Sequence, residues 1–179
     1  AGEYYCIVTD RYRNSTRSEN ATLVVMKIPV AIVTPPEQNH ECSRIAFEDI
    51  VLDLNYWDPG TTFVWTRDNP SGIITTIPLN GSASNIGDVL SGSFINTSND
   101  PIKITFLITP IGPDPTYCVG TPVPAAVVVN PTPRVIPINS QPTICYGKST
   151  EIMLTTPTNM TKGNIVFDYF VAFEGLPGD

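Results

Sequence analysis

Histidine is almost absent from this sequence of 179 residues, which contains a single one, His40. Catalytic arrangements such as Ser-His-Asp or Cys-His need a histidine base beside the nucleophile. His40 follows a proline-rich stretch that we expect to be a linker, which is a poor place to hold a base in a fixed geometry. The sequence therefore predicts a protein that is not an enzyme, with no catalytic residues and no cofactor.

Positive charge and long apolar runs are also scarce. The chain has 10 Lys and Arg against 17 Asp and Glu, and its net charge is -7. Such a chain repels phosphate backbones, so we expect no nucleic-acid partner. No apolar run approaches the roughly 20 residues that span a bilayer, so we expect no membrane span. The start, Ala1 to Cys6, lacks the pattern of a signal peptide and opens in mid-strand, so we expect a piece of a longer chain.

Closely spaced cysteine pairs are missing too. The four cysteines are Cys6, Cys42, Cys118 and Cys145, and none has a CxxC partner of the kind found in zinc sites. Four cysteines permit three pairings, which composition does not distinguish. Disulfides are found mainly outside the cytoplasm, so we expect an oxidising, extracytoplasmic setting.

Helical periodicity is absent as well, and the composition favours strands. No segment of useful length repeats apolar residues at the three-to-four spacing of an amphipathic helix. The chain contains 18 Pro and 12 Gly together with many Thr, Val and Asn, which favours strands joined by tight turns. Since 41% of the residues are hydrophobic, the chain can bury a core. We therefore expect an all-β fold.

Residues 41–130 contain the strongest strand patterns and are expected to form one complete β-sandwich. Apolar residues alternate with polar ones at 50–54, 62–66, 102–109 and 123–129, so each strand has one face for a core and one for solvent. The predicted core residues are Phe63, Trp65, Ile104, Phe106 and Val127.

Residues 1–28 have the pattern of the last two strands of an immunoglobulin-like domain. Tyr4, Cys6 and Val8 alternate and are expected to face a core, with Tyr4 as a tyrosine corner. Residues 21–25 return as the final strand. The alternative is an N-terminal hairpin added to the following domain.

Proline-rich segments at 29–40 and 131–139 are expected to be stiff linkers. After the second linker the landmarks of the first part return at a nearly constant spacing. The spacing is 103 residues for Cys42 and Cys145 and for Gly60 and Gly163, 104 for Pro29 and Pro133, and 102 for Ile50 and Ile152. Independent landmarks that agree on one spacing indicate a repeat. Residues 140–179 are therefore expected to be the N-terminal half of a second sandwich.

The positions of Cys42 and Cys118 suggest a disulfide. They lie just outside the first and last predicted strands of the sandwich, where a bond would tie the ends of the domain together. In the chain-entropy model, a loop of this length stabilises the fold by about 4 kcal/mol. The repeat supports this pairing, because the corresponding partner of Cys145 would lie beyond Asp179.

Asp53, Asn55 and Asp58 form the one close group of hard oxygen ligands, which are the ligands that calcium prefers. Asp58 also begins an Asp-Pro-Gly turn, so a plain turn is the alternative. The neighbouring aromatics Tyr56 and Trp57 could stack on a sugar ring.

Several motifs in a fixed order resemble a known family. They are Thr62 to Thr66, Asn96 to Pro101, Thr105 to Pro110, Cys118 to Pro122 and Val127 to Pro133. Together they resemble the PKD-like repeats of giant surface proteins in gliding Bacteroidota, the SprB-type gliding-motility adhesins. The resemblance covers residues 42–133 well and 134–179 in part, while residues 43–58 are bulkier and more acidic than the family's usual small residues.

The resemblance implies tandem immunoglobulin/PKD-like sandwiches, the first and last incomplete, displayed outside the outer membrane after type IX secretion. The implied partners are neighbouring repeats, the gliding motor or type IX secretion machinery, and surface polysaccharide. We therefore predict a non-catalytic spacer and display segment of a filamentous adhesin used in gliding and attachment. The alternatives are a carbohydrate-binding module of a secreted multidomain enzyme and a metazoan-type adhesion receptor.

Overall fold

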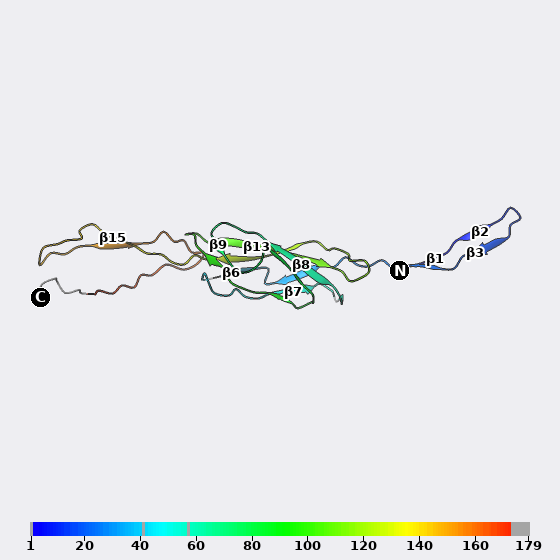
Figure 1. Cartoon of the computed structure of the whole chain (residues 1–179), viewed down its shortest axis with the longest axis horizontal. Coiled ribbons are helices and arrows are strands. Elements are labelled where there is room, and N and C mark those ends of the chain that lie inside the picture. Colours follow the sequence, from blue (N-terminus) through cyan, green and yellow to red (C-terminus); the bar gives the residue numbers. More distant parts are fainter. Residues whose placement is uncertain (1, 41, 57, 173–179) are drawn as a thin grey trace.

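A computed structural model of the chain describes residues 2–40, 42–56 and 58–172. The described residues form strands, turns and loops without a helix, which confirms the all-β prediction. Figure 1 shows an elongated molecule. A hairpin lies at one end, a β-sandwich occupies the middle, and a second hairpin with an extended segment lies at the other end.

The sandwich is built from two main sheets. The smaller sheet has the order β11-β7-β5 and comprises β11 (Val89–Leu90), β7 (Ile50–Leu54) and β5 (Ala31–Thr34). The larger sheet has the order β10-β8-β13-β14-β6. It comprises β10 (Asn80–Ala83), β8 (Thr62–Arg67), β13 (Ile102–Ile111), β14 (Val123–Val129) and β6 (Glu37–His40). A separate short pair joins β9 (Ile73–Ile74) to β12 (Ile95–Asn96).

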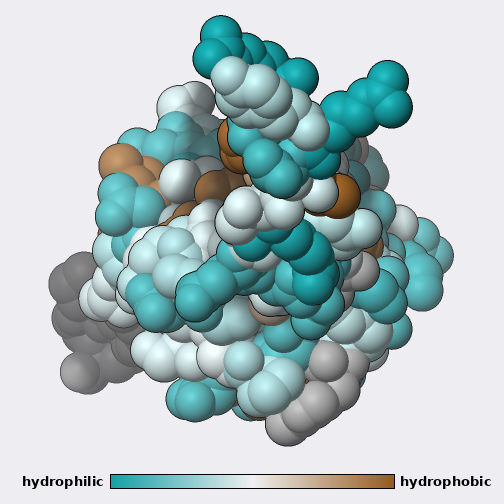
Figure 2. All heavy atoms as spheres, turned by 90° about the vertical axis from the view of Figure 1, so that its right-hand side faces the viewer, coloured by the Kyte–Doolittle hydropathy of each residue, from teal (hydrophilic) through white to brown (hydrophobic). Residues whose placement is uncertain are grey.

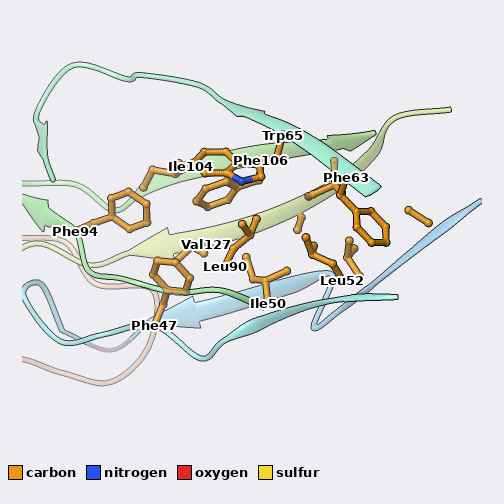
Figure 3. Packing of buried hydrophobic residues seen from close by; sticks show 14 of the residues in the cluster. Phe47, Ile50, Leu52, Phe63, Trp65, Leu90, Phe94, Ile104, Phe106 and Val127 are labelled. Carbon is orange, nitrogen blue, oxygen red and sulfur yellow. The ribbon is translucent and has the colours of Figure 1, made fainter. Parts of the chain in front are cut away.

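The core lies between the two sheets and follows the predicted alternation. The five predicted core residues are each 8% exposed or less, which confirms those assignments. Aromatic rings fill one half of the core: the centroids of Phe47 and Phe94 are 5.5 Å apart, and Trp65 meets Phe106 edge-on at 5.7 Å (Figure 3). Such packing of large apolar side chains is the main source of stability in a sandwich of this size.

The segment 29–40 is not a linker, and that prediction was wrong. It contains β5 and β6, which pair with β7 and β14 respectively. Ala31 and Val33 point inward and are 5% and 6% exposed, so β5 contributes to the core. The prolines do not interrupt these strands because Pro29 precedes β5, and Pro35 and Pro36 lie between β5 and β6, where the chain passes from one sheet to the other.

β6 and β14 pair in parallel, whereas every other strand pair of the described residues is antiparallel. Glu37 lies beside Ala126 at one end of the pair and His40 beside Val129 at the other. β6, near the start of the sandwich, and β14, its last strand, therefore run in the same direction. The chain enters at one end, here called the leading end, and leaves at the opposite end, the trailing end (Figure 1).

The N-terminal segment is a long hairpin outside the sandwich. It comprises β1 (Gly2–Tyr4) paired with β4 (Ala21–Leu23) and β2 (Ile7–Thr9) paired with β3 (Ser15–Arg17). The returning strand was predicted, but Tyr4, Cys6 and Val8 do not face a core. Tyr4 and Val8 are 58% and 67% exposed, and Cys6 is exposed. Membership of an immunoglobulin-like domain therefore stays a prediction.

The C-terminal segment contains a hairpin of β15 (Ile136–Asn139) and β16 (Ile152–Thr155). β15 lies within the range 131–139 that was predicted to be a linker. β15 pairs with β16 in the same register in which β5 pairs with β7. Val33 pairs with Leu52, and the residues 104 and 102 positions later, Pro137 and Leu154, are also paired. An apolar groove beside this hairpin includes Ile165, Val166 and Phe167, in the region that corresponds to the strand of Phe63 and Trp65. The shared register is what the predicted repeat requires, and the repeat itself stays a prediction.

We predict that Phe106→Ala lowers the free energy of unfolding by about 3–5 kcal/mol, because the ring is fully buried among aromatic neighbours. Leu107→Ala is the matched control on the opposite face of the same strand. Leu107 is 46% exposed, so we expect a loss below about 1 kcal/mol. Urea denaturation measures both, and equal losses would contradict the assignment of the two faces.

Candidate functional site

The described residues contain no recognisable catalytic or metal-binding cluster. His40, the one histidine, lies at the end of β6, where its backbone pairs with Val129. No group of three or more His, Cys, Asp and Glu side chains in the described part of the chain could hold a metal ion. The loops of the sandwich gather at its two ends, and the candidate sites described below lie there.

The calcium candidates lie at the leading end, and they make local contacts at the end of β7 and in the turn that follows it. The carboxylate of Asp53 accepts the N–H of Leu54 at 2.7 Å. The carbonyl of Asp58 accepts the N–H of Thr61 at 3.2 Å, which closes the turn before β8. Asn55 uses its N–H to donate to the carbonyl of Val30 at 3.1 Å. These contacts favour the plain turn, and calcium binding stays a prediction.

Tyr56 lies at the same end but does not present an open platform for a sugar. The ammonium of Lys27 lies 5.3 Å from its ring centroid, so a cation covers one face of the ring. The hydroxyl is buried without a hydrogen-bond partner in the described structure. Burial, and then the charges of Asp58 and Cys118, raise the pKa of Tyr56 above its ordinary value. Trp57, the other candidate for stacking, lies outside the described residues.

The predicted disulfide between Cys42 and Cys118 is wrong, because the two residues lie at opposite ends of the sandwich. Cys42 follows β6 and Cys118 precedes β14, and these two strands run parallel. The seven residues of β14 separate the two positions by about 20 Å, whereas bridged cysteines have Cα atoms within about 7 Å of each other. All four cysteines are free thiols. The prediction placed both residues just outside terminal strands but did not include the direction of those strands.

A cluster of hydrogen-bonded polar residues lies at the trailing end, and the sequence did not single it out as a site. Asn130 is 3% exposed, and its side-chain oxygen accepts hydrogen bonds from the backbone and hydroxyl of Thr161. Asn159 and Arg134 make further bonds to the loop that contains Asp100. The sequence did contain one indication of this cluster. Two of the family-like motifs, Asn96 to Pro101 and Val127 to Pro133, contain polar residues for which the sequence suggested no catalytic role.

The face of the molecule on the side of the N-terminal hairpin is mainly hydrophilic. Figure 2 looks along the long axis from the side of the N-terminal hairpin and shows mostly polar and neutral residues with small, scattered apolar patches. No helix of the described residues is long and apolar enough to cross a membrane.

Residues 39–133 match the family described as the PKD-like domain, and this match covers more than half of the chain. It spans β7 to β14 and the second half of β6. A comparison with curated proteins found no match.

We predict that Tyr56→Phe keeps or raises the thermal midpoint at neutral pH, because phenylalanine removes a buried hydroxyl without a partner and keeps the ring beneath Lys27. The raised pKa of Tyr56 stabilises the folded state below pH 10, and that contribution disappears as the pH rises through the pKa of the folded protein. The wild type should therefore lose stability more steeply than the variant above about pH 10. Calorimetry across this range measures the difference, and a lower midpoint for the variant at pH 7 would contradict the assignment.

We also predict that a reductant leaves the thermal midpoint unchanged, because no bond between Cys42 and Cys118 stabilises the sandwich. Non-reducing peptide mapping should find no peptide that links these two residues. A linked peptide, together with a midpoint that falls on reduction, would refute the structural placement of the two cysteines.

Proposed function

The chain belongs to the PKD-like domain family, and on this premise we propose that it is a non-catalytic spacer and display segment of a large filamentous cell-surface adhesin. A PKD-like domain is typically a non-catalytic module and is often found in extracellular proteins. Gliding motility and surface attachment are the processes that we propose for the parent filament.

The observation that carries this proposal is the course of the chain through the sandwich. Because β6 and β14 run in the same direction, the chain enters at the leading end and leaves at the trailing end. Each module of this kind adds its full length to a filament, and successive modules contact mainly their neighbours. A module with both connections at one end would add little reach.

Our proposal for location and partners rests on the sequence resemblance. We infer type IX secretion, display on the exterior of the outer membrane, and contact with neighbouring repeats. The gliding motor or secretion machinery and a surface polysaccharide are the further partners that we propose. The elongated form of the described chain fits a protein that reaches away from a surface (Figure 1).

The test uses the cells that make the protein. Protease added to intact cells should remove the segment while a periplasmic marker survives, and the treated cells should lose attachment and gliding. A chromosomal deletion of residues 29–130, whose ends lie at opposite ends of the sandwich, should give the same loss. Protection of the segment in intact cells, or normal gliding after its removal, would refute the proposed function.

A further inference from the structure

The trailing end of the sandwich carries a rigid polar surface, here called the socket, formed by Thr97, Asn99, Asp100 and Asn130. Asn96 fixes it from beneath. This residue is 2% exposed, and its amide donates to the carbonyls of Asp100 and Val129, both at 2.8 Å. The loop from 97 to 100 is therefore tied directly to the end of β14. Buried, fully paired amides of this kind hold their surroundings in one arrangement.

The following segment contacts the socket through residues 158–161, here called the docking loop. The N–H of Asn159 donates to the carbonyl of Asn99 at 2.7 Å, and its side-chain amide donates to the carboxylate of Asp100 at 2.6 Å. The backbone N–H and hydroxyl of Thr161 donate to the side-chain oxygen of Asn130 at 3.1 and 3.0 Å.

Arg134 adds a second point of attachment, close to where the chain leaves the sandwich. Its guanidinium donates to the carbonyl of Thr97 at 2.7 Å. Its backbone N–H donates to the hydroxyl of Thr158 at 3.0 Å, and Thr158 is only 6% exposed. The following segment is thus held both at its start and, 24 residues later, at the docking loop.

Two attachments combined with a proline-rich connection restrict rotation. Pro131 and Pro133 fix the backbone φ angle between the sandwich and Arg134. Domains joined by a small interface normally move relative to each other. Here hydrogen bonds to the socket hold both Arg134, next to the proline connection, and the docking loop. A change in the angle between the sandwich and the following segment would therefore break several hydrogen bonds together.

The residues that correspond to Arg134 and Thr158 in the sandwich are also in contact, at the leading end, but with different chemistry. The sequence spacings of 104 and 103 relate Arg134 to Val30 and Thr158 to Asn55. The N–H of Asn55 donates to the carbonyl of Val30 at 3.1 Å, so the corresponding contact is present. The counterpart of Asn159 is Tyr56, which packs against Lys27 instead of accepting or donating at a polar socket.

We propose that the socket is an interface for the following repeat of the chain, and that it sets a fixed angle between successive modules. The partner that fits the socket is a loop with a side-chain amide at the position of Asn159 and a hydroxyl at the position of Thr161. It is accompanied by an arginine at the position of Arg134. The loop at 55–58 carries a tyrosine and an aspartate at these two positions, so it does not fit this socket, and the order of modules is encoded at their ends. This inference deepens the proposed spacer function, on which its biological meaning rests.

The test measures residual dipolar couplings on the full 179-residue chain in a weakly aligned solution. The amides of β15 and β16 should fit the same alignment tensor as those of β8, β13 and β14. Arg134→Ala combined with Asn159→Ala should break this agreement, because the side-chain hydrogen bonds to the carbonyl of Thr97 and to the carboxylate of Asp100 are both lost. Arg134 and Asn159 are exposed, so the amide spectrum of the sandwich should not change.

The matched control is Arg11→Ala with Asn80→Ala, which removes the same two side-chain types from exposed positions in the N-terminal hairpin and in β10. It should keep the shared tensor. Separate tensors in the wild type, or a shared tensor in the socket variant, would overturn the proposal. A flexible junction would leave the spacer function standing as a beaded chain, so the two proposals fail on different results.

Discussion

The parallel pairing of β6 with β14 is the constraint on which the rest of this structure depends. It places the entry and the exit of the chain at opposite ends of the sandwich. It explains why Cys42 and Cys118 lie far apart, because one follows a strand and the other precedes its parallel neighbour. It also creates two distinct ends, with Tyr56 and Lys27 at one and the socket at the other. The opposite placement of the chain's entry and exit follows from this single pairing.

The alternation of apolar residues made the core predictable, while chain direction was not encoded locally. Phe63, Trp65 and Phe106 were assigned from a two-residue period, and burial between two sheets confirms them. Pro29, Pro35 and Pro36 were interpreted as a linker because proline disfavours strands, yet all three lie just outside β5 and β6. Whether β6 pairs with β14, and in which direction, depends on contacts between residues about 90 positions apart, so no local pattern reveals it.

The candidate site was harder to predict because it is made by polar groups from three separate segments. Asn96 and Asn130 stood out only as members of a family-like motif, and their roles depend on partners that the fold brings together. Asp53, in β7, and Asp58, in the turn before β8, attracted a calcium hypothesis because they are close in sequence. The structure gives them backbone partners instead. Residues that are close in sequence were therefore a weaker indication of a site than residues that the ends of the strands bring together.

The most direct test of this account is the direction of β6 relative to β14, measured by nuclear Overhauser effects between backbone protons in the full chain. The account predicts contacts between Glu37 and Ala126 and between Asn39 and Val128, which is the parallel order. The reverse order, with Glu37 beside Val128 and Asn39 beside Ala126, would contradict it. In that case the entry and exit would no longer be forced to opposite ends, and the argument for an extending module would fail.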